Sequence, residues 1–124
     1  MKHNLKYAGL THKIIGCGMK VHGYFGAGFP EIIYHRAMII ELRNAGCSFD
    51  SEMEKAVFYH AEEVGRRRVD LIVEGCVLVE LKAISELDPY SSNQVINCLK
   101  VFDMEVGLLL NFGRPSLEYK RFVN

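Results

Sequence analysis

Three residues near the middle of the chain, Asp70, Glu80 and Lys82, have the types and spacing of a catalytic site. Asp70 interrupts one apolar run, and Glu80 and Lys82 stand two residues apart in the next. Because side chains alternate along a strand, Glu80 and Lys82 then project from one face. A carboxylate in a central strand is costly unless it is paired or binds a metal. We therefore expect the three side chains to come from adjacent strands and to meet in one concave pocket.

A divalent cation would account for the two carboxylates. Mg²⁺ (or Mn²⁺) binds through one or two carboxylates and keeps several waters, which can attack a phosphodiester. In this hypothesis Asp70 and Glu80 are the metal ligands, and Lys82 orients the attacking water or stabilises charge that develops on the phosphate. In the alternative, Glu80 and Lys82 form a solvated pair on an exposed face and Asp70 begins a turn.

The surrounding pattern predicts the elements that would position these residues. Helical spacing covers residues 11–22 and 32–46, with Gly46 as the stop, and a third helix begins at Asp88 and runs to 102. Apolar and β-branched runs predict strands at 56–60, 69–73, 77–81, 106–111 and 117–122. We interpret 23–28 as a glycine-rich turn and 62–65 as a polar turn. This order predicts an α/β domain of the α+β kind, with helices flanking a central mixed β-sheet.

Length and composition place the chain in a broad class. Its 124 residues fit a single domain, 1–124, and 49% hydrophobic with 24% charged residues is typical of a soluble globular protein. No apolar run approaches the roughly 20 residues that a bilayer span needs, and the polar N-terminus has no signal-peptide pattern. The four cysteines are widely spaced and form no CxxC pair, so we expect free thiols. We therefore expect a cytoplasmic protein without a membrane partner.

The charges are balanced overall but are not evenly spread. Fifteen Lys and Arg residues offset fifteen Asp and Glu residues, which counts against a long duplex-binding surface. Arg66, Arg67 and Arg68 form the only dense basic run, immediately before an apolar strand pattern. We interpret these three arginines as candidate substrate-binding residues at a local anion site.

A family resemblance strengthens the metal hypothesis. Gly28, Glu31 and Tyr34 have the spacing Gly-x-x-Glu-x-x-Tyr, the signature of the GxxExxY protein family. That family is similar to the PD-(D/E)xK nuclease superfamily, and the resemblance implies a restriction-endonuclease-like core with the metal at Asp70 and Glu80. The chain departs from the usual pattern at Val69, where Pro is common, and at Cys98, where Tyr is frequent. The other matching pieces are Val21-His22, Val69–Val73, Val79–Ala83, Gln94 and Asn111–Gly113.

Three further residues are candidates for supporting roles. Glu31 and Tyr34 share a helix face, so Glu31 could assist the metal site and Tyr34 could contact substrate. A first-turn Glu stabilised by the helix dipole, with Tyr34 in the core, would explain both residues equally well. Gln94 would hydrogen-bond a substrate phosphate or a water on the metal; alternatively, it is a solvated helix residue.

Two functions remain open at this point. The first is a Mg²⁺- or Mn²⁺-dependent nuclease that hydrolyses phosphodiester bonds in nucleic acid, with Asp70, Glu80, Lys82, Glu31 and Gln94 as its catalytic set. The second is a catalytically weak or inactive nuclease-like domain that serves as a protein-interaction module, in contact with another protein or a second copy. Neutral charge and the short chain favour the second function. Clustering of the three arginines with Lys82 and Lys100 around the site would favour the first.

Overall fold

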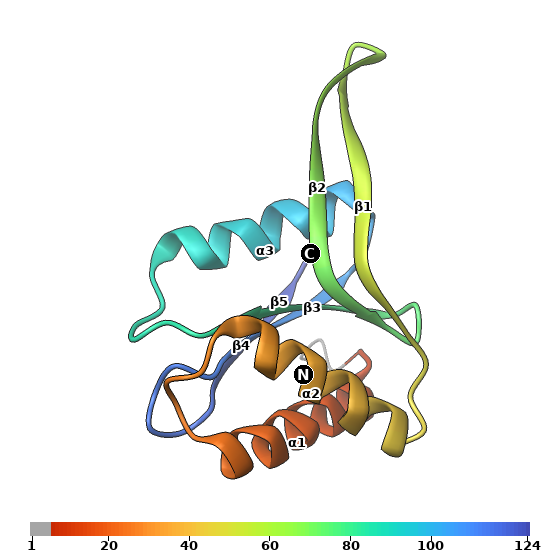
Figure 1. Cartoon of the computed structure of the whole chain (residues 1–124). Helices are drawn as coiled ribbons and strands as arrows, with labels where there is room; N and C mark the ends of the chain where they lie inside the picture. Colours follow the sequence, from red (N-terminus) through yellow and green to blue (C-terminus); the bar gives the residue numbers. More distant parts are fainter. Residues whose placement is uncertain (1–5) are drawn as a thin grey trace, which may run out of the picture.

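A central sheet lies between two helical layers in the computed structural model, which describes residues 6–124 (Figure 1). Two helices cover one face of the sheet and the third helix covers the other. The elements follow the order α1 (Ala8–Phe25), α2 (Glu31–Asn44), β1 (Phe49–Tyr59), β2 (Glu62–Val73), β3 (Val77–Lys82), α3 (Pro89–Val101), β4 (Val106–Asn111) and β5 (Glu118–Val123).

The sheet is mixed, as the sequence predicts. Its strands follow the order β1-β2-β3-β4-β5, and every neighbouring pair is antiparallel except β3 with β4. The parallel pair follows from the connection, because two parallel strands need a crossover and α3 supplies it. The other pairs are joined by short turns. The α+β prediction with flanking helices is therefore confirmed.

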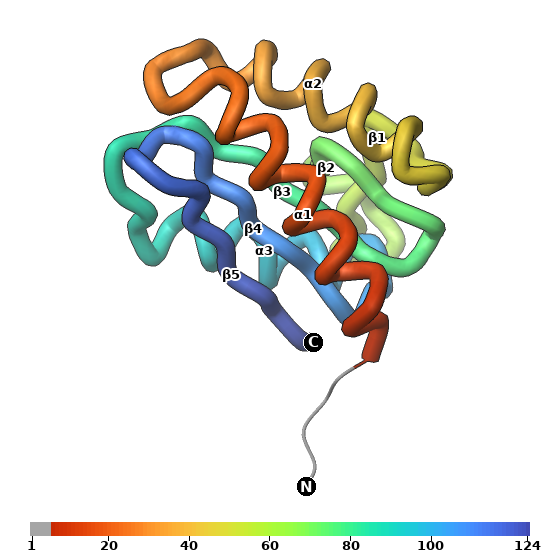
Figure 2. The backbone as a smooth tube through the Cα atoms, turned by 90° about the horizontal axis from the view of Figure 1, so that it is seen from below, coloured from red at the N-terminus to blue at the C-terminus, as the bar shows by residue number. Residues whose placement is uncertain are grey.

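The core has one apolar cluster on each face of the sheet. Alternate residues of β3 divide between the clusters: Val77 and Val79 pack against α1 and α2, while Leu78 packs against α3. In β4, Leu108 and Leu109 divide in the same way. Strands β3 and β4 are thus buried on both faces, which explains why their sequences are nearly continuous apolar runs. Figure 2 shows α1 lying along the sheet on the side away from α3.

Helix α1 is longer than the sequence predicts. Gly23 belongs to its last turn, so the expected turn at 23–28 is wrong for its first half. The helix continues because the Phe25 ring packs edge-on against Phe29 and Tyr34, at centroid distances of 5.2 and 6.2 Å. This tertiary packing outweighs the poor helix propensity of glycine. The loop that follows has Gly26 and Gly28 at positive φ, a conformation that favours glycine.

The hairpin of β1 and β2 also differs from expectation. The predicted turn at 62–65 is wrong, because β2 begins at Glu62 and the chain reverses at His60 and Ala61. Both residues have positive φ, 49° and 66°, as in the tight turns that match strand twist. The two strands consequently form a long arm that rises beside α3 (Figure 1).

Two predicted helix ends are confirmed by their local chemistry. The Asp88 carboxylate accepts a hydrogen bond from the Ser91 N–H at 2.9 Å and caps α3. At the end of α2, Gly46 has a φ of 76°, and the Cys47 N–H donates to the Leu42 carbonyl at 2.9 Å. This is the Schellman arrangement, in which glycine follows the last helical residues.

Between residues 6 and 124, no helix has both the length and the apolar character required to cross a membrane. The prediction about a leader concerns the N-terminal stretch, most of which lies outside the described residues. The four cysteines carry free thiols.

Candidate active site

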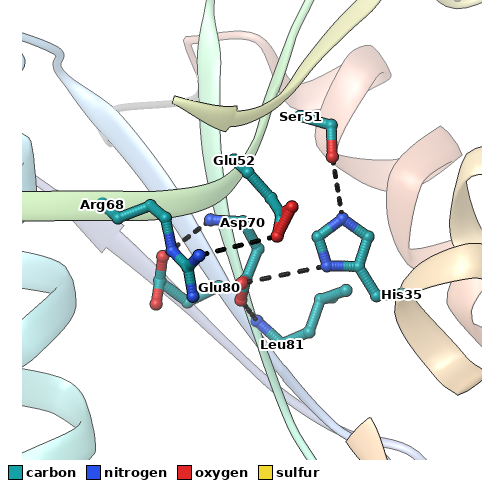
Figure 3. A network of polar contacts seen from close by, with 7 residues as sticks. All are labelled: His35, Ser51, Glu52, Arg68, Asp70, Glu80 and Leu81. Atoms are coloured by element: carbon teal, nitrogen blue, oxygen red, sulfur yellow. Dashed lines mark hydrogen bonds and ion pairs between the residues drawn. The ribbon is translucent and has the colours of Figure 1, made fainter. Parts of the chain in front are cut away.

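The candidate site lies where the pairing of β2 with β3 ends. The last registered pair is Leu71 with Val79. Beyond it, Asp70 on β2 and Glu80 on β3 are not joined main chain to main chain, and their side chains accept hydrogen bonds from the opposite strand instead. The Asp70 N–H donates to Glu80 Oε1 at 3.1 Å, and the Leu81 N–H donates to Asp70 Oδ2 at 2.7 Å (Figure 3). The two carboxylates therefore occupy the gap that opens between the strands.

Strand β2 also changes face at this point. Val69 packs in the cluster against α3, whereas Leu71 packs in the cluster against α1 and α2. Regular alternation would place residues two apart on the same face. The neighbouring strand is irregular here too, because Glu52 falls between the registered pairs and has a φ of 56°. This local break turns Asp70 toward α2 while Glu80 faces α3.

Lys82 and Gln94 meet beside the two acids. Lys82 stands two residues beyond Glu80 on β3, and its Nζ donates to Gln94 Oε1 on α3 at 3.1 Å. Asp70 lies on β2, and Glu80 and Lys82 lie on β3, so the three residues come from adjacent strands as expected. Gln94 is not a solvated helix residue, since its side chain is half-buried and holds the lysine.

His35 is part of the site, although the sequence analysis did not identify it. Its Nδ1 lies 3.9 Å from Asp70 Oδ1, and its Nε2 lies 3.0 Å from Ser51 Oγ (Figure 3). The ring is buried, with 7% of the residue exposed. The available signal was its position four residues after Glu31, which places both side chains on one helix face.

The site gathers acidic side chains in a poorly solvated place. Burial, and after it the nearby Asp70 carboxylate, raises the pKa of Glu80 to about 8. Partial burial raises the pKa of Glu31, and Asp70 again contributes. The Cys98 thiol has a pKa of about 11, mainly because of burial and then because of Glu80. A bound cation would relieve the repulsion among these groups.

The residues present fit a largely hydrated divalent ion. Within 6–124, no group of three or more His, Cys, Asp and Glu side chains is arranged as a metal-binding cluster. A site made wholly from protein ligands is therefore not built here. Asp70 and Glu80 nevertheless flank the same gap between β2 and β3, Asp70 on the α2 side and Glu80 on the α3 side, and Mg²⁺ accepts one or two carboxylates with retained waters.

A comparison of the sequence with protein-family models agrees with the fold described above. Residues 8–122 match the family model described as the PD-(D/E)XK nuclease superfamily. The chain belongs to the PD-(D/E)XK nuclease superfamily. Nucleases of this superfamily generally use divalent metals. A comparison with curated proteins finds no match.

A solved structure resembles this PD-(D/E)XK domain along nearly its whole length. The crystal structure of SSO0001 superposes with a TM-score of 0.59 at 15% sequence identity. The match covers 97% of this chain and 60% of the SSO0001 chain, so this domain corresponds to part of that longer protein. At this identity the similarity concerns the fold alone.

The predicted single pocket is wrong for this PD-(D/E)XK domain, because two cavities flank β2. Asp70 lines a depression of 370 Å³ beside α2, together with Glu31 and His35. Glu80 lines a cavity of 340 Å³ beside α3, together with Gln94. Arg68 borders both. The separation follows from the face change at Asp70.

Tyr34 lies in the core and not on a substrate surface. Its residue is fully buried, and its ring stacks on Phe112 at 4.6 Å with an interplanar angle of 13°. The hydroxyl donates to the Gly26 carbonyl at 2.5 Å and accepts from the Phe29 N–H at 3.2 Å. Tyr34 therefore shapes the loop before α2, and its ring is not available to a ligand.

The three arginines do not share one environment. Arg66 pairs with Glu54 at 3.0 Å, and Arg68 pairs with Glu52 at 3.6 Å. Arg67 makes no ion pair within the described part of the chain. All three line the cavity beside α3 that reaches Glu80.

Proposed function

We propose that this chain is a Mg²⁺- or Mn²⁺-dependent nuclease that hydrolyses phosphodiester bonds in nucleic acid. The observation that carries the proposal is the break between β2 and β3, where Glu80 accepts a hydrogen bond from the Asp70 N–H and Asp70 accepts one from the Leu81 N–H. Membership of a nuclease superfamily supports the reaction class. The matching GxxExxY spacing leads us to propose that family as the closer relation.

Each residue at the break would have a separate task. Asp70 and Glu80 would hold the ion, and a bound divalent cation would supply Lewis-acid activation and positive charge at the phosphate. The Lys82 ammonium would stabilise charge that develops on the phosphate, and Gln94 holds that ammonium in place at 3.1 Å. Glu31 would add negative charge beside Asp70 and strengthen cation binding.

The basic residues beside the site favour the nuclease over an interaction module. Arg67 lines the cavity that contains Glu80, and Lys100 lines the adjoining cavity, so positive charge lies beside the approach to Glu80 although the net charge is zero. Nucleic acid is therefore the proposed partner. A cytoplasmic location and a contact with another protein or a second copy stay predictions from the sequence.

Cleavage by Lys82→Ala tests the proposed division of tasks. We expect single-turnover cleavage at saturating enzyme to fall by about 10²-fold, because the lysine acts on charge that appears in the transition state. Arg67→Ala should bind substrate more weakly and keep a nearly normal single-turnover rate. Single- and double-stranded DNA and RNA are to be tested in Mg²⁺ and in Mn²⁺. Wild-type protein that cuts none of them would favour the interaction module, and a Lys82→Ala enzyme with wild-type turnover would refute the role of the lysine.

A further inference from the structure

We propose that the trough between the β1–β2 arm and α3 binds a single strand of nucleic acid, with Lys55, Arg67 and Lys100 contacting its phosphates. The inference rests on the proposed function, because the trough leads to Glu80. It specifies the form of the substrate and the surface that receives it.

The trough is formed by two adjoining cavities. One, of 390 Å³, lies between the arm and the C-terminal half of α3, and includes Val57, Gly65 and Lys100. The other, of 340 Å³, reaches Glu80 and Tyr90. The two cavities share Arg66, Arg67 and Asn97 in their walls, so they are neighbouring parts of one groove. A polymer lying along the arm would therefore pass directly to the acidic site.

Charge on the arm is segregated between its two faces. In the antiparallel register Lys55 stands directly opposite Arg67, so both side chains are on one face. The next pair on that face, Val57 with Gly65, lines the trough together with residues of α3. Lys55 and Arg67 therefore lie on the face of the arm that is turned toward α3. Neither Lys55 nor Arg67 makes an ion pair in the part of the chain that the structure describes.

Three acids of the arm pair with Arg66 or Arg68 and not with Lys55 or Arg67. Arg66 pairs with Glu54 and with Glu63, at 3.0 and 3.5 Å, and Arg68 pairs with Glu52. Like charges directly opposite across two strands destabilise a sheet. Lys55 and Arg67 therefore form an unfavourable pair of like charges on the face of the arm toward the trough. An anionic ligand bound there would offset their repulsion.

The facing wall of the trough is free of negative charge. Helix α3 contains no Asp or Glu from Pro89 to Val101. Asn93, Asn97 and Lys100 follow at helical spacing along the trough. Tyr90 stands at the end near Glu80 and is 69% exposed. Basic side chains that follow a backbone, combined with an exposed ring on which a base can stack, are typical of single-strand binding sites.

The shape of the trough favours one strand over a duplex. The arm and α3 supply facing walls of the trough, and Glu80 is half-buried in it. A single strand lying along this groove would bring a phosphate to Glu80 without a second strand having to fit between the walls.

Binding in the presence of EDTA tests the proposal without cleavage. The probes are a fluorescently labelled oligothymidylate, an oligouridylate and a DNA duplex of the same length, measured by anisotropy over a series of salt concentrations. We expect the single strands to bind several-fold more tightly than the duplex. Arg67→Gln and Lys100→Gln should each weaken single-strand binding and reduce the slope of log affinity against log salt by about 0.7. Tyr90→Leu should weaken binding about tenfold through lost stacking.

Matched controls separate local from general effects of charge. Arg43→Gln makes the same substitution at an exposed arginine in the last turn of α2, on the opposite face of the sheet from the trough, so binding should stay within about twofold of the wild type. Arg67→Lys retains the charge and should bind nearly as well as the wild type. Preferred binding of the duplex, unchanged binding by Arg67→Gln and Lys100→Gln, or no binding of any probe would overturn the proposal.

The outcomes also distinguish this inference from the nuclease proposal. Single-strand binding that depends on Arg67 and Lys100, together with no cleavage in Mn²⁺, would contradict the nuclease and leave the trough assignment intact. Cleavage that is equally strong on duplex and insensitive to these variants would contradict the trough and leave the nuclease intact.

Discussion

Asp70 and Glu80 determine the properties of the site at the scale of single residues. Each carboxylate accepts a hydrogen bond from a main-chain amide of the opposite strand, at 2.7 and 3.1 Å. Their presence was predictable, because ionisable residues stand out in apolar strands. Two features could not be predicted. The approach of His35 to Asp70 depends on how α2 packs on the sheet, and the face change of β2 has no local sequence signal.

Glu80 should make the metal-free protein less stable as pH rises. Its pKa is about 8 in the folded protein and 4.5 ordinarily, so between these values the folded state binds more protons than the unfolded state. The free energy of unfolding therefore falls as pH increases through this window. Glu80→Gln removes the titration, and we expect it to equal the wild type near pH 5 and to exceed it by about 1–3 kcal/mol at pH 9.

Urea unfolding in EDTA at several pH values measures this difference. Glu86→Gln is the matched control, because Glu86 is exposed and forms no ion pair in residues 6–124; it should follow the wild-type pH dependence. If Glu80→Gln loses stability between pH 5 and 9 as steeply as the wild type does, the assigned pKa is wrong.

At the scale of elements, the buried Asn111 side chain fixes the chain that leaves β3. It accepts from the Ile84 N–H and the Gly113 N–H, and donates to the Ile84 carbonyl, at 3.0 to 3.1 Å. The backbone is so close here that a side chain at Gly113 would meet the Ile84 oxygen at 2.2 Å. Because Ile84 follows Lys82 by two residues, this clamp helps to fix the lysine against α3.

Asn111→Ala should lower the free energy of unfolding by about 2–4 kcal/mol, because buried backbone groups at Ile84 and Gly113 lose their partners. Chemical denaturation measures the change. Asn44→Ala is the control, since Asn44 is exposed at the end of α2 and its loss should alter stability by no more than about 0.5 kcal/mol. A similar small effect for both variants would show that the clamp contributes little.

Sequence patterns predicted elements well where the determining chemistry is local. The cap at Asp88 and the stop at Gly46 are set by residues within a few positions, and both were predictable. The hairpin reversal at His60 and Ala61 was not, because neither residue is a glycine or asparagine that signals such a turn. The extension of α1 through Phe25 depends on rings from α2 and its preceding loop.

At the scale of the whole molecule, the three layers bring two distributions of charge together. The acids lie in the gap between β2 and β3, and Lys55 and Arg67, which form no ion pair within residues 6–124, face the trough that leads to Glu80. A count of charges gives zero and conceals this separation. The fold class was predictable from the order of elements. The long arm and its position beside α3 became visible only in three dimensions (Figure 1).

The central claim is that Asp70 and Glu80 together hold a divalent ion. Calorimetric titration of the purified protein with Mn²⁺ tests it directly, with Asp70→Asn as the variant and Asp103→Asn as the control. Asp103 is an exposed carboxylate after α3, so its replacement should not change metal affinity. We expect one binding site in the wild type and in Asp103→Asn, and at least about tenfold weaker binding in Asp70→Asn. Equal affinity in all three proteins, or no binding to the wild type at millimolar Mn²⁺, would contradict the claim.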